Sequence, residues 1–259
     1  MTAVPNIAQP GTVYLVGAGP GDPELITVRG LRLLHAADVV LYDRLLHPGL
    51  LEEAVRAEKV FVGKAPGHPG VGQRGIHRRL VHHARLGRVV VRLKGGDPFI
   101  FGRGGEEAAA LAAAGVPYEV VPAVSSAFAA PGSVGIPLTH RRLARSFAVV
   151  TAHRVGDGDL PWPALATLDT LVVLMGVAAL PRIARALVAH GRSPQTPAAL
   201  VAKATLPGQR ALTGTLQDLP HLAVQAAIEP PATLVIGEVV RLGHQAVQDF
   251  TTELRAAEL

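Results

Sequence analysis

Short apolar runs alternate with segments of helical spacing along the first half of the chain. Apolar runs bounded by glycine, proline or aspartate are typical of buried strands, whereas apolar residues three or four positions apart are typical of amphipathic helices. Strands are expected at residues 12–16, 39–42, 60–62, 88–92 and 118–121. Helices are expected at residues 23–35, 50–55, 76–86 and 106–114, with another opened by residues 122–127. This alternation predicts one parallel or mixed α/β sheet.

The pattern changes at residues 132–140, a passage punctuated by glycine and proline. A second series of strands is expected after it, at residues 147–151, 171–175, 198–202, 211–213 and 234–236, with helices at 181–190, 216–227 and 245–257. The predicted fold class is α/β, with two α/β domains of about five strands each. Their bounds are expected at 12–137 and 146–243, with 138–145 as linker and 244–259 as a C-terminal helix or tail. Because interdomain clefts favour ligands, the ligand cleft is expected between the two domains.

Composition narrows the class of protein. Hydrophobic residues make up 49% of the chain, yet no apolar run reaches the roughly 18 residues that a membrane span needs. The N-terminal residues lack the basic start and apolar middle of a signal peptide. The absence of cysteine excludes disulfides, thiolate metal sites and cysteine nucleophiles. A soluble cytoplasmic protein without membrane association is expected.

The charge balance predicts an anionic partner. The formal net charge is +5 and the pI about 10.1. Nucleic acid is the usual partner of such a protein. However, the basic residues are dispersed, and aromatic residues, which could stack on single strands, make up only 4%. A small substrate bearing several carboxylates explains the surplus equally well, so charge alone does not choose between the two.

The richest loop of the chain runs from Arg92 to Glu107. It follows the apolar run at residues 89–91 and contains five glycines together with Asp97 and Arg103. In open α/β sheets, ligands bind outside the carboxyl ends of strands, and glycines permit sharp bends or a close approach to a ligand. This loop is predicted to form part of a ligand site.

A second glycine-rich loop, at residues 17–22, suggests a dinucleotide fingerprint with Asp43 as ribose acceptor. The pattern G-x-G-x-x-G, however, requires glycine where this chain has Asp22. A carboxylate there would repel a pyrophosphate, and Pro20 removes a backbone N–H donor. The loop therefore favours an uncharged or cationic cofactor.

Asp43 and Lys64 close two successive strands and are expected at the same edge of the sheet. A functional pair there could transfer a proton or hold a polar group of a substrate. A surface ion pair of about 0–1 kcal/mol explains their positions equally well.

Several other polar residues favour structural explanations when judged by position alone. Eleven histidines occur without the paired spacing of a metal site, so no metal is expected. Met175 at a strand end favours core packing. Ser125 and Ser126 lack a G-x-S-x-G elbow, and helix capping is the preferred interpretation.

Taken together, the motifs of this chain resemble those of a uroporphyrinogen-III C-methyltransferase of the tetrapyrrole methylase superfamily. They span most of the chain in the family's order. The matching segments are Val16–Pro23, Asp38–Leu45, Phe61–Lys64, Arg92–Glu107, Gly135–Arg141 and Glu238–Leu242. The resemblance covers one methylase unit, and the oxidase and ferrochelatase part of fused sirohaem synthases is expected to be absent.

This resemblance implies an S-adenosyl-L-methionine-dependent C-methyltransferase that acts as a homodimer. It would methylate uroporphyrinogen III at ring carbons 2 and 7, giving precorrin-2 for sirohaem or cobalamin, with S-adenosyl-L-homocysteine as the second product. The substrate carries eight carboxylates, which would account for the basic surplus. No metal and no nucleic acid would be involved.

The resemblance also implies roles for individual residues. Asp43 and Lys64 would be the catalytic acid and base, and Arg44, Arg103 and Arg141 would bind substrate carboxylates. The donor would be bound by Pro20, Gly95, Gly96, Asp97, Ile100, Ser125, Ser126, Met175 and Ala204. Two departures from the family pattern concern the shape of the donor pocket: Ala123 stands where the family usually has glycine, and Lys203–Thr205 replaces a commoner form.

Three alternatives remain open. A sibling methylase would act on a later precorrin, and a macromolecular methylase of the superfamily would bind RNA or protein, with salt-sensitive binding to RNA. A nicotinamide dehydrogenase would bind NADH tightly and S-adenosylhomocysteine not at all.

Overall fold

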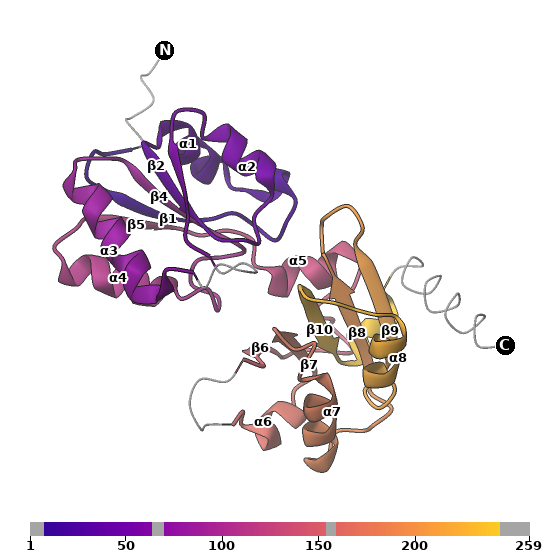
Figure 1. The fold of residues 1–259 in the computed structure, drawn as a ribbon. Helices are drawn as coiled ribbons and strands as arrows, with labels where there is room; N and C mark the ends of the chain where they lie inside the picture. The colour runs from indigo at the N-terminus through magenta and orange to yellow at the C-terminus, as the bar shows by residue number, and fades with distance from the viewer. Residues whose placement is uncertain (1–7, 64–69, 154–158, 244–259) are drawn as a thin grey trace. The chain divides into compact units, whose positions relative to one another are not determined.

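The computed structural model describes residues 8–63, 70–153 and 159–243. The chain forms two compact units, Met1–Ser125 and Ser126–Leu259 (Figure 1). Lys64 and the helix expected at 245–257 lie outside the described residues.

The first unit is built on a parallel sheet of five strands. These are β1 (Val13–Gly17), β2 (Val39–Tyr42), β3 (Glu58–Phe61), β4 (Val90–Lys94) and β5 (Tyr118–Val121). Their order across the sheet is β3-β2-β4-β1-β5, and every neighbouring pair is parallel. The prediction of a parallel α/β sheet is confirmed, and all strand carboxyl ends lie at one edge.

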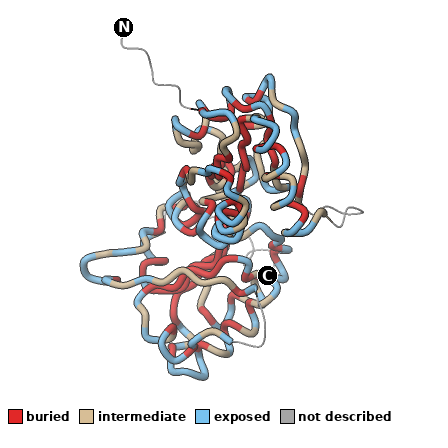
Figure 2. The backbone as a smooth tube through the Cα atoms, turned by 90° about the vertical axis from the view of Figure 1, so that its left-hand side faces the viewer, coloured by how far each residue is buried: buried red, intermediate tan, exposed pale blue. Residues whose placement is uncertain are grey.

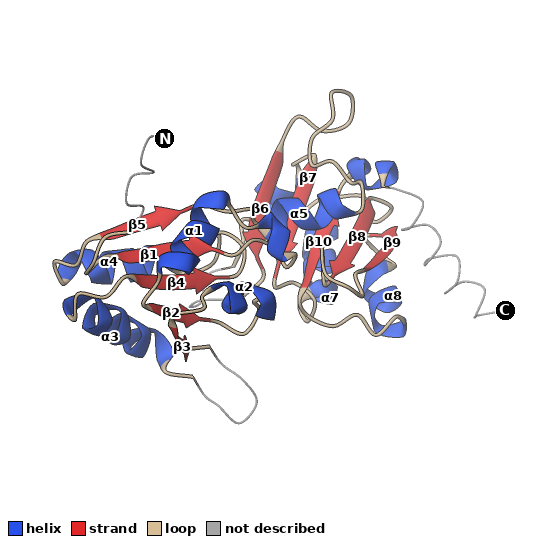
Figure 3. Ribbon diagram, turned by 90° about the horizontal axis from the view of Figure 1, so that it is seen from above, coloured by secondary structure: helices blue, strands red, loops and turns tan. Residues whose placement is uncertain are grey.

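Helices cover both faces of this sheet (Figures 1 and 3). One face packs against α1 (Val28–Ala36) and α2 (Pro48–Glu53), and the other against α3 (Gly72–Arg85) and α4 (Gly104–Ala113). Successive residues of a strand point to opposite faces, so alternate residues of β1 enter the two cores. Buried residues, red in Figure 2, follow the strands. Burial on both faces explains why β1 and β2 are continuous apolar runs, whereas β3, at the edge of the sheet, begins with two exposed charged residues.

The helix expected at residues 23–35 is divided in two. A short 3₁₀ helix, η1 (Pro23–Leu25), ends at Ile26, whose backbone is extended. Thr27 then caps α1, because its hydroxyl oxygen accepts the Gly30 N–H at 3.1 Å. This break redirects the chain between β1 and the face that α1 covers.

The second unit contains a mixed sheet of five strands. These are β6 (Phe147–Thr151), β7 (Thr170–Leu174), β8 (Pro197–Ala202), β9 (Arg210–Thr215) and β10 (Ala232–Ile236), in the order β6-β7-β10-β8-β9. Only β6 and β7 pair in parallel, whereas β10 runs antiparallel between β7 and β8, and β9 antiparallel to β8. β7 and β8 therefore point the same way and have their carboxyl ends at the same edge.

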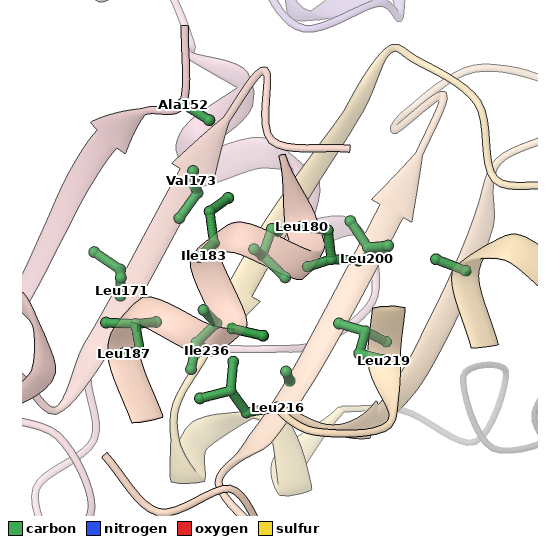
Figure 4. Close-up of a cluster of buried hydrophobic side chains, with 14 of the residues drawn as sticks. Ala152, Leu171, Val173, Leu180, Ile183, Leu187, Leu200, Leu216, Leu219 and Ile236 are labelled. Carbon is green, nitrogen blue, oxygen red and sulfur yellow. The ribbon is translucent and has the colours of Figure 1, made fainter. Parts of the chain in front are cut away.

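The main core of the second unit lies between this sheet and three helices (Figure 4). They are α6 (Trp162–Ala166), α7 (Leu180–Ala189) and α8 (Leu219–Gln225). Leu171 and Val173 of β7 pack there with Leu180 and Ile183 of α7. The α6 helix was not among the predicted elements, because five residues are too few to show helical spacing.

The opposite face of the second sheet is covered by α5 (Ser126–Ser133) and the 3₁₀ helix η2 (Glu238–Leu242). Ala130 and Val134 pack against Ala199, Val201 and Val235. The division between units therefore falls at Ser125, because α5 shares its core with the second sheet. The predicted first domain ended at residue 137 and included α5. The observed division, between Ser125 and Ser126, differs from this boundary.

Within the described residues, no helix combines the length and apolar character that a bilayer crossing requires.

Candidate functional site

The loops after β1 and β4 cross at the carboxyl edge of the first sheet. β1 continues to β2, which lies beyond β4, while β4 continues to β5, which lies beyond β1, so each loop passes its neighbour. Gly19 and Gly96 pair where the loops meet, each donating its N–H to the other's carbonyl, at 3.3 and 2.7 Å. The Ala18 N–H donates to the Lys94 carbonyl at 2.8 Å. The two glycine-rich segments found in the sequence thus form one structure.

Close approach of three loops explains the glycine at position 17. A Cβ atom there would lie 2.5 Å from the Ala123 Cβ and 2.6 Å from the Gly96 carbonyl oxygen, so only glycine fits. The methyl group of Ala123, a departure from the usual family residue, lies over Gly17. Because Gly17 has no side chain, the methyl group of Ala123 can occupy the space next to it.

Asp97 connects the loop after β4 to the segment after β5 through hydrogen bonds. Its Oδ1 accepts the Phe99 N–H at 2.8 Å, and its Oδ2 accepts the Ala123 N–H at 3.0 Å. Both carboxylate oxygens are therefore engaged with backbone groups. Asp97 sets the shape of the loops, in addition to the negative charge that it brings to them.

The parts of the loops next to the Gly19–Gly96 pairing carry carboxylates, and Arg103, at the far end of the loop after β4, pairs with Glu106. Asp22 and Asp97 are the ionisable residues of segments 17–22 and 95–102. This donor set suits a neutral or positively charged ligand, and it disfavours a diphosphate, as the sequence predicted.

The structure brings together the predicted donor residues of the first unit, although their contact with a donor stays a prediction. They lie on the crossing loops or just after β5, at one edge of the sheet: Pro20, Gly95, Gly96, Asp97, Ile100 and Ser125. Gly95 and Ile100 are exposed, whereas Ser125 is buried.

In the second unit, Met175 follows β7 and Ala204 follows β8, at the same edge of that sheet. Met175 is 53% exposed and has φ of 55°, so the interpretation of this residue as core is wrong. Ala204 lies between Lys203 and Thr205, whose φ angles are 50° and 64°. Such left-handed conformations are rare outside glycine and concentrate at functional loops. Ser126 is the first residue of α5.

Asp43 follows β2 and belongs to a chain of four charged side chains. Arg92 Nη2 donates to Asp43 Oδ2 at 2.7 Å, and Arg92 Nε donates to Glu107 Oε1 at 3.1 Å. Lys94 Nζ also donates to Glu107 Oε1 at 3.1 Å. Burial lowers the pKa of Lys94, and the nearby Arg92 lowers it further. Sequence reasoning did not propose Arg92, Lys94 or Glu107 as functional.

The predicted substrate arginines lie on exposed segments. Arg44 and Arg141 are exposed. Arg103, with φ of 59°, forms two hydrogen bonds to Glu106, from Nε at 2.8 Å and from Nη2 at 2.6 Å. This pairing lowers the pKa of Glu106. Across the residues that the structure describes, no group of three or more His, Asp or Glu side chains is arranged to share a metal ion.

Residues 12–220 match the family Tetrapyrrole (Corrin/Porphyrin) Methylases. The chain belongs to this family. Solved structures of the uroporphyrin III C-methyl transferase from Thermus thermophilus share its fold. The native form is 48% identical with a TM-score of 0.78, covering 89% of this chain and 99% of that one. The same protein complexed with S-adenyl homocysteine has a TM-score of 0.79.

The curated relatives of this tetrapyrrole methylase are longer proteins. The siroheme synthase of Pseudomonas fluorescens is 53% identical over 235 residues, covering 90% of this chain and 51% of the relative. That of Gluconacetobacter diazotrophicus is 52% identical over 241 residues. The methylase spans about half the length of these relatives. A cobalt precorrin-4 methyltransferase structure has a TM-score of 0.79 at 29% identity.

Proposed function

We propose that this methylase transfers methyl groups from S-adenosyl-L-methionine to carbons 2 and 7 of uroporphyrinogen III, giving precorrin-2 in sirohaem or cobalamin biosynthesis. The main support is the pair of crossing loops, whose hydrogen-bonded segments carry Asp22 and Asp97, in a chain 48% identical to a uroporphyrin III C-methyl transferase. A relative complexed with S-adenyl homocysteine supports the same donor.

The donor is proposed to bind through the loop residues Gly95, Gly96 and Asp97, together with Pro20. When bound, S-adenosylmethionine supplies an electrophilic methyl group on a positively charged sulfur. The carboxylates of the loops match this charge. Ile100, Ser125, Ser126, Met175 and Ala204 are proposed to complete its binding.

The protein's own contribution is positioning and proton transfer. Because the acceptor is an electron-rich pyrrole carbon and the methyl group is already activated, alignment and exclusion of water should account for most of the rate. Asp43 is proposed to hold pyrrole N–H groups and, with Lys64, to form the acid and base pair of the site. Lys64 is proposed to hold a substrate carboxylate or to assist the later loss of a ring proton. Arg44, Arg103 and Arg141 are proposed to bind some of the eight substrate carboxylates.

We also propose that the enzyme works as a homodimer in the cytoplasm, with no nucleic acid and no membrane as partner. Sedimentation at micromolar protein concentration tests the dimer directly.

The reaction is tested by incubating the protein with uroporphyrinogen III and isotopically labelled S-adenosylmethionine under anaerobic conditions. The expected product carries two labelled methyl groups, on ring carbons 2 and 7, and each is added with the loss of one proton. Absence of labelled tetrapyrrole, with methylation of a later precorrin instead, would contradict the proposed substrate.

Replacing Arg103 with Ala should raise the KM for the tetrapyrrole about 10- to 100-fold, because a charged hydrogen-bonding partner of a carboxylate contributes about 1.5–3 kcal/mol. The dissociation constant for S-adenosylhomocysteine should stay nearly constant. Steady-state kinetics and calorimetry measure the two quantities.

A matched control is available in the second unit. Arg241 pairs with Glu238 three residues before it, from Nε at 2.9 Å, and is exposed like Arg103. Arg241→Ala should leave the KM unchanged. A loss of donor affinity in Arg103→Ala, without a change in the KM, would remove Arg103 from the substrate site.

A further inference from the structure

A buried carboxylate lies behind the proposed catalytic residue and does not reach it directly. Arg92 and Lys94 are two positions apart in β4, so both side chains point to the face that α3 and α4 cover. Glu107 of α4 meets both of them there. Arg92 in turn reaches Asp43 after the neighbouring strand β2. The four charges form a single chain that ends at Asp43.

Burial along this chain is graded. The Glu107 side chain is 0% exposed and that of Arg92 is 2% exposed, whereas that of Asp43 is 34% exposed. The charges of the two cations and the two carboxylates in this chain cancel. A buried ion pair is seldom a net gain over apolar packing, because desolvation offsets the attraction. Stability alone therefore explains this arrangement poorly.

The contacts of Arg92 fix its guanidinium plane. Nε donates to Glu107, Nη2 donates to Asp43, and Nη1 donates to the carbonyls of Leu41 at 3.4 Å and Leu93 at 3.2 Å. A planar group held along three of its nitrogens has little freedom to rotate. Asp43 Oδ2 is thereby held in place, and the partly exposed carboxylate is presented at the carboxyl edge of the sheet.

We propose that Glu107 is a positioning residue for the methyl-transfer reaction: through its hydrogen bond to Arg92 Nε, it orients the guanidinium that holds Asp43. This inference rests on the proposed function and extends it to a residue that touches neither substrate nor donor. The competing explanation is that Glu107 only balances the charge of Lys94, whose Nζ lies 3.1 Å from both of its oxygens.

Two double variants separate these explanations. Glu107→Gln/Lys94→Met and Glu107→Met/Lys94→Met each remove one buried cation and one buried carboxylate, so both keep the charge balance. Glutamine still offers an oxygen to Arg92 Nε, whereas methionine offers none. A difference between the two variants therefore reports on the amide group that carries the acceptor oxygen, at constant charge.

The variant with glutamine should keep kcat near that of the unchanged protein. The variant with methionine should lower kcat about 10-fold, the effect of losing one hydrogen bond to a charged group. Its KM for uroporphyrinogen III and its dissociation constant for S-adenosylhomocysteine should stay within about twofold, since Glu107 touches neither ligand. A merely structural role would not lower kcat alone.

Equal kcat values in two well-folded variants would overturn the proposal in favour of charge balance. If the methionine variant does not fold, Glu107→Asn/Lys94→Met provides the test, because its shorter amide withdraws from Arg92 Nε at the same charge balance and should also lower kcat. Crystal structures give a readout that does not depend on activity. The Arg92 Nη2–Asp43 Oδ2 contact should be kept with glutamine and lost with methionine. An unchanged contact in both would refute the positioning role, whereas failure of the unchanged protein to methylate uroporphyrinogen III would refute the proposed function instead.

Discussion

Replacing Asp43 with Asn should lower kcat for tetrapyrrole methylation about 10²–10⁴-fold, the usual contribution of a general acid or base. The fold should survive, because the asparagine carbonyl can still accept the hydrogen bond that Arg92 Nη2 donates to Asp43. Donor binding should be unaffected, since Asp43 follows β2 and is not on the crossing loops. Single-turnover kinetics with saturating donor measure the effect on chemistry.

Asp38 provides the control for this substitution. It precedes the same strand, β2, and its Oδ2 accepts the Val89 N–H at 2.7 Å. Asp38→Asn changes the charge by the same amount at the opposite end of the strand and should leave kcat nearly unchanged. If both variants methylate at the rate of the unchanged protein, Asp43 has no part in proton transfer.

Replacing Asp97 with Ala should weaken S-adenosylhomocysteine binding about 10- to 100-fold. The substitution removes two charge-assisted hydrogen bonds, each of about 1.5–3 kcal/mol, and frees the loop after β4 from the segment after β5. The negative charge proposed to match the donor's sulfonium is lost as well, so S-adenosylmethionine should lose more affinity than S-adenosylhomocysteine. Calorimetric titration of both ligands measures the two effects separately.

Asp169 offers a matched comparison for Asp97. Its Oδ2 also accepts two backbone N–H groups, from Arg145 at 2.9 Å and Ser146 at 3.0 Å, but it precedes β7 in the second unit. Asp169→Ala should lower thermal stability without changing the donor's dissociation constant. A similar loss of affinity in both variants would mean that Asp97 acts only through general stability.

The hydrophobic pattern was sufficient to predict most of the strands and helices of the fold. Strands β2, β5 and β6 begin and end at the predicted residues, because each is a short apolar run between clear turn residues. The antiparallel arrangement around β10 could not be predicted, since strand direction depends on contacts between distant segments. The place of α5 was missed for the same reason: its small apolar residues fit either unit, and only packing against β8 and β10 decides.

The site was predicted less evenly. Glycine loops and the residues after strand ends are local signals, and they singled out Asp97 and Asp43, whose roles stay predictions. Position alone assigned Met175 to the core, and only the family resemblance assigned it to the donor site. The buried chain behind Asp43 was missed because the strand was expected to end at Arg92, which placed Lys94 in a loop. A usable signal was present: two cations spaced by two residues in an apolar run must share one buried face, and buried cations need carboxylates. The carboxylate that pairs with both cations is Glu107 of α4. Tertiary packing determines this pairing, and the sequence pattern does not show it.

Calorimetric titration of the unchanged protein tests the central claim most directly, namely that the crossing loops accept a positively charged methyl donor and not a dinucleotide. S-adenosylmethionine and S-adenosylhomocysteine should each bind with saturation and compete with each other, while NAD and NADH should produce no saturable heat. Saturable binding of a nicotinamide dinucleotide, with none of S-adenosylhomocysteine, would contradict the account.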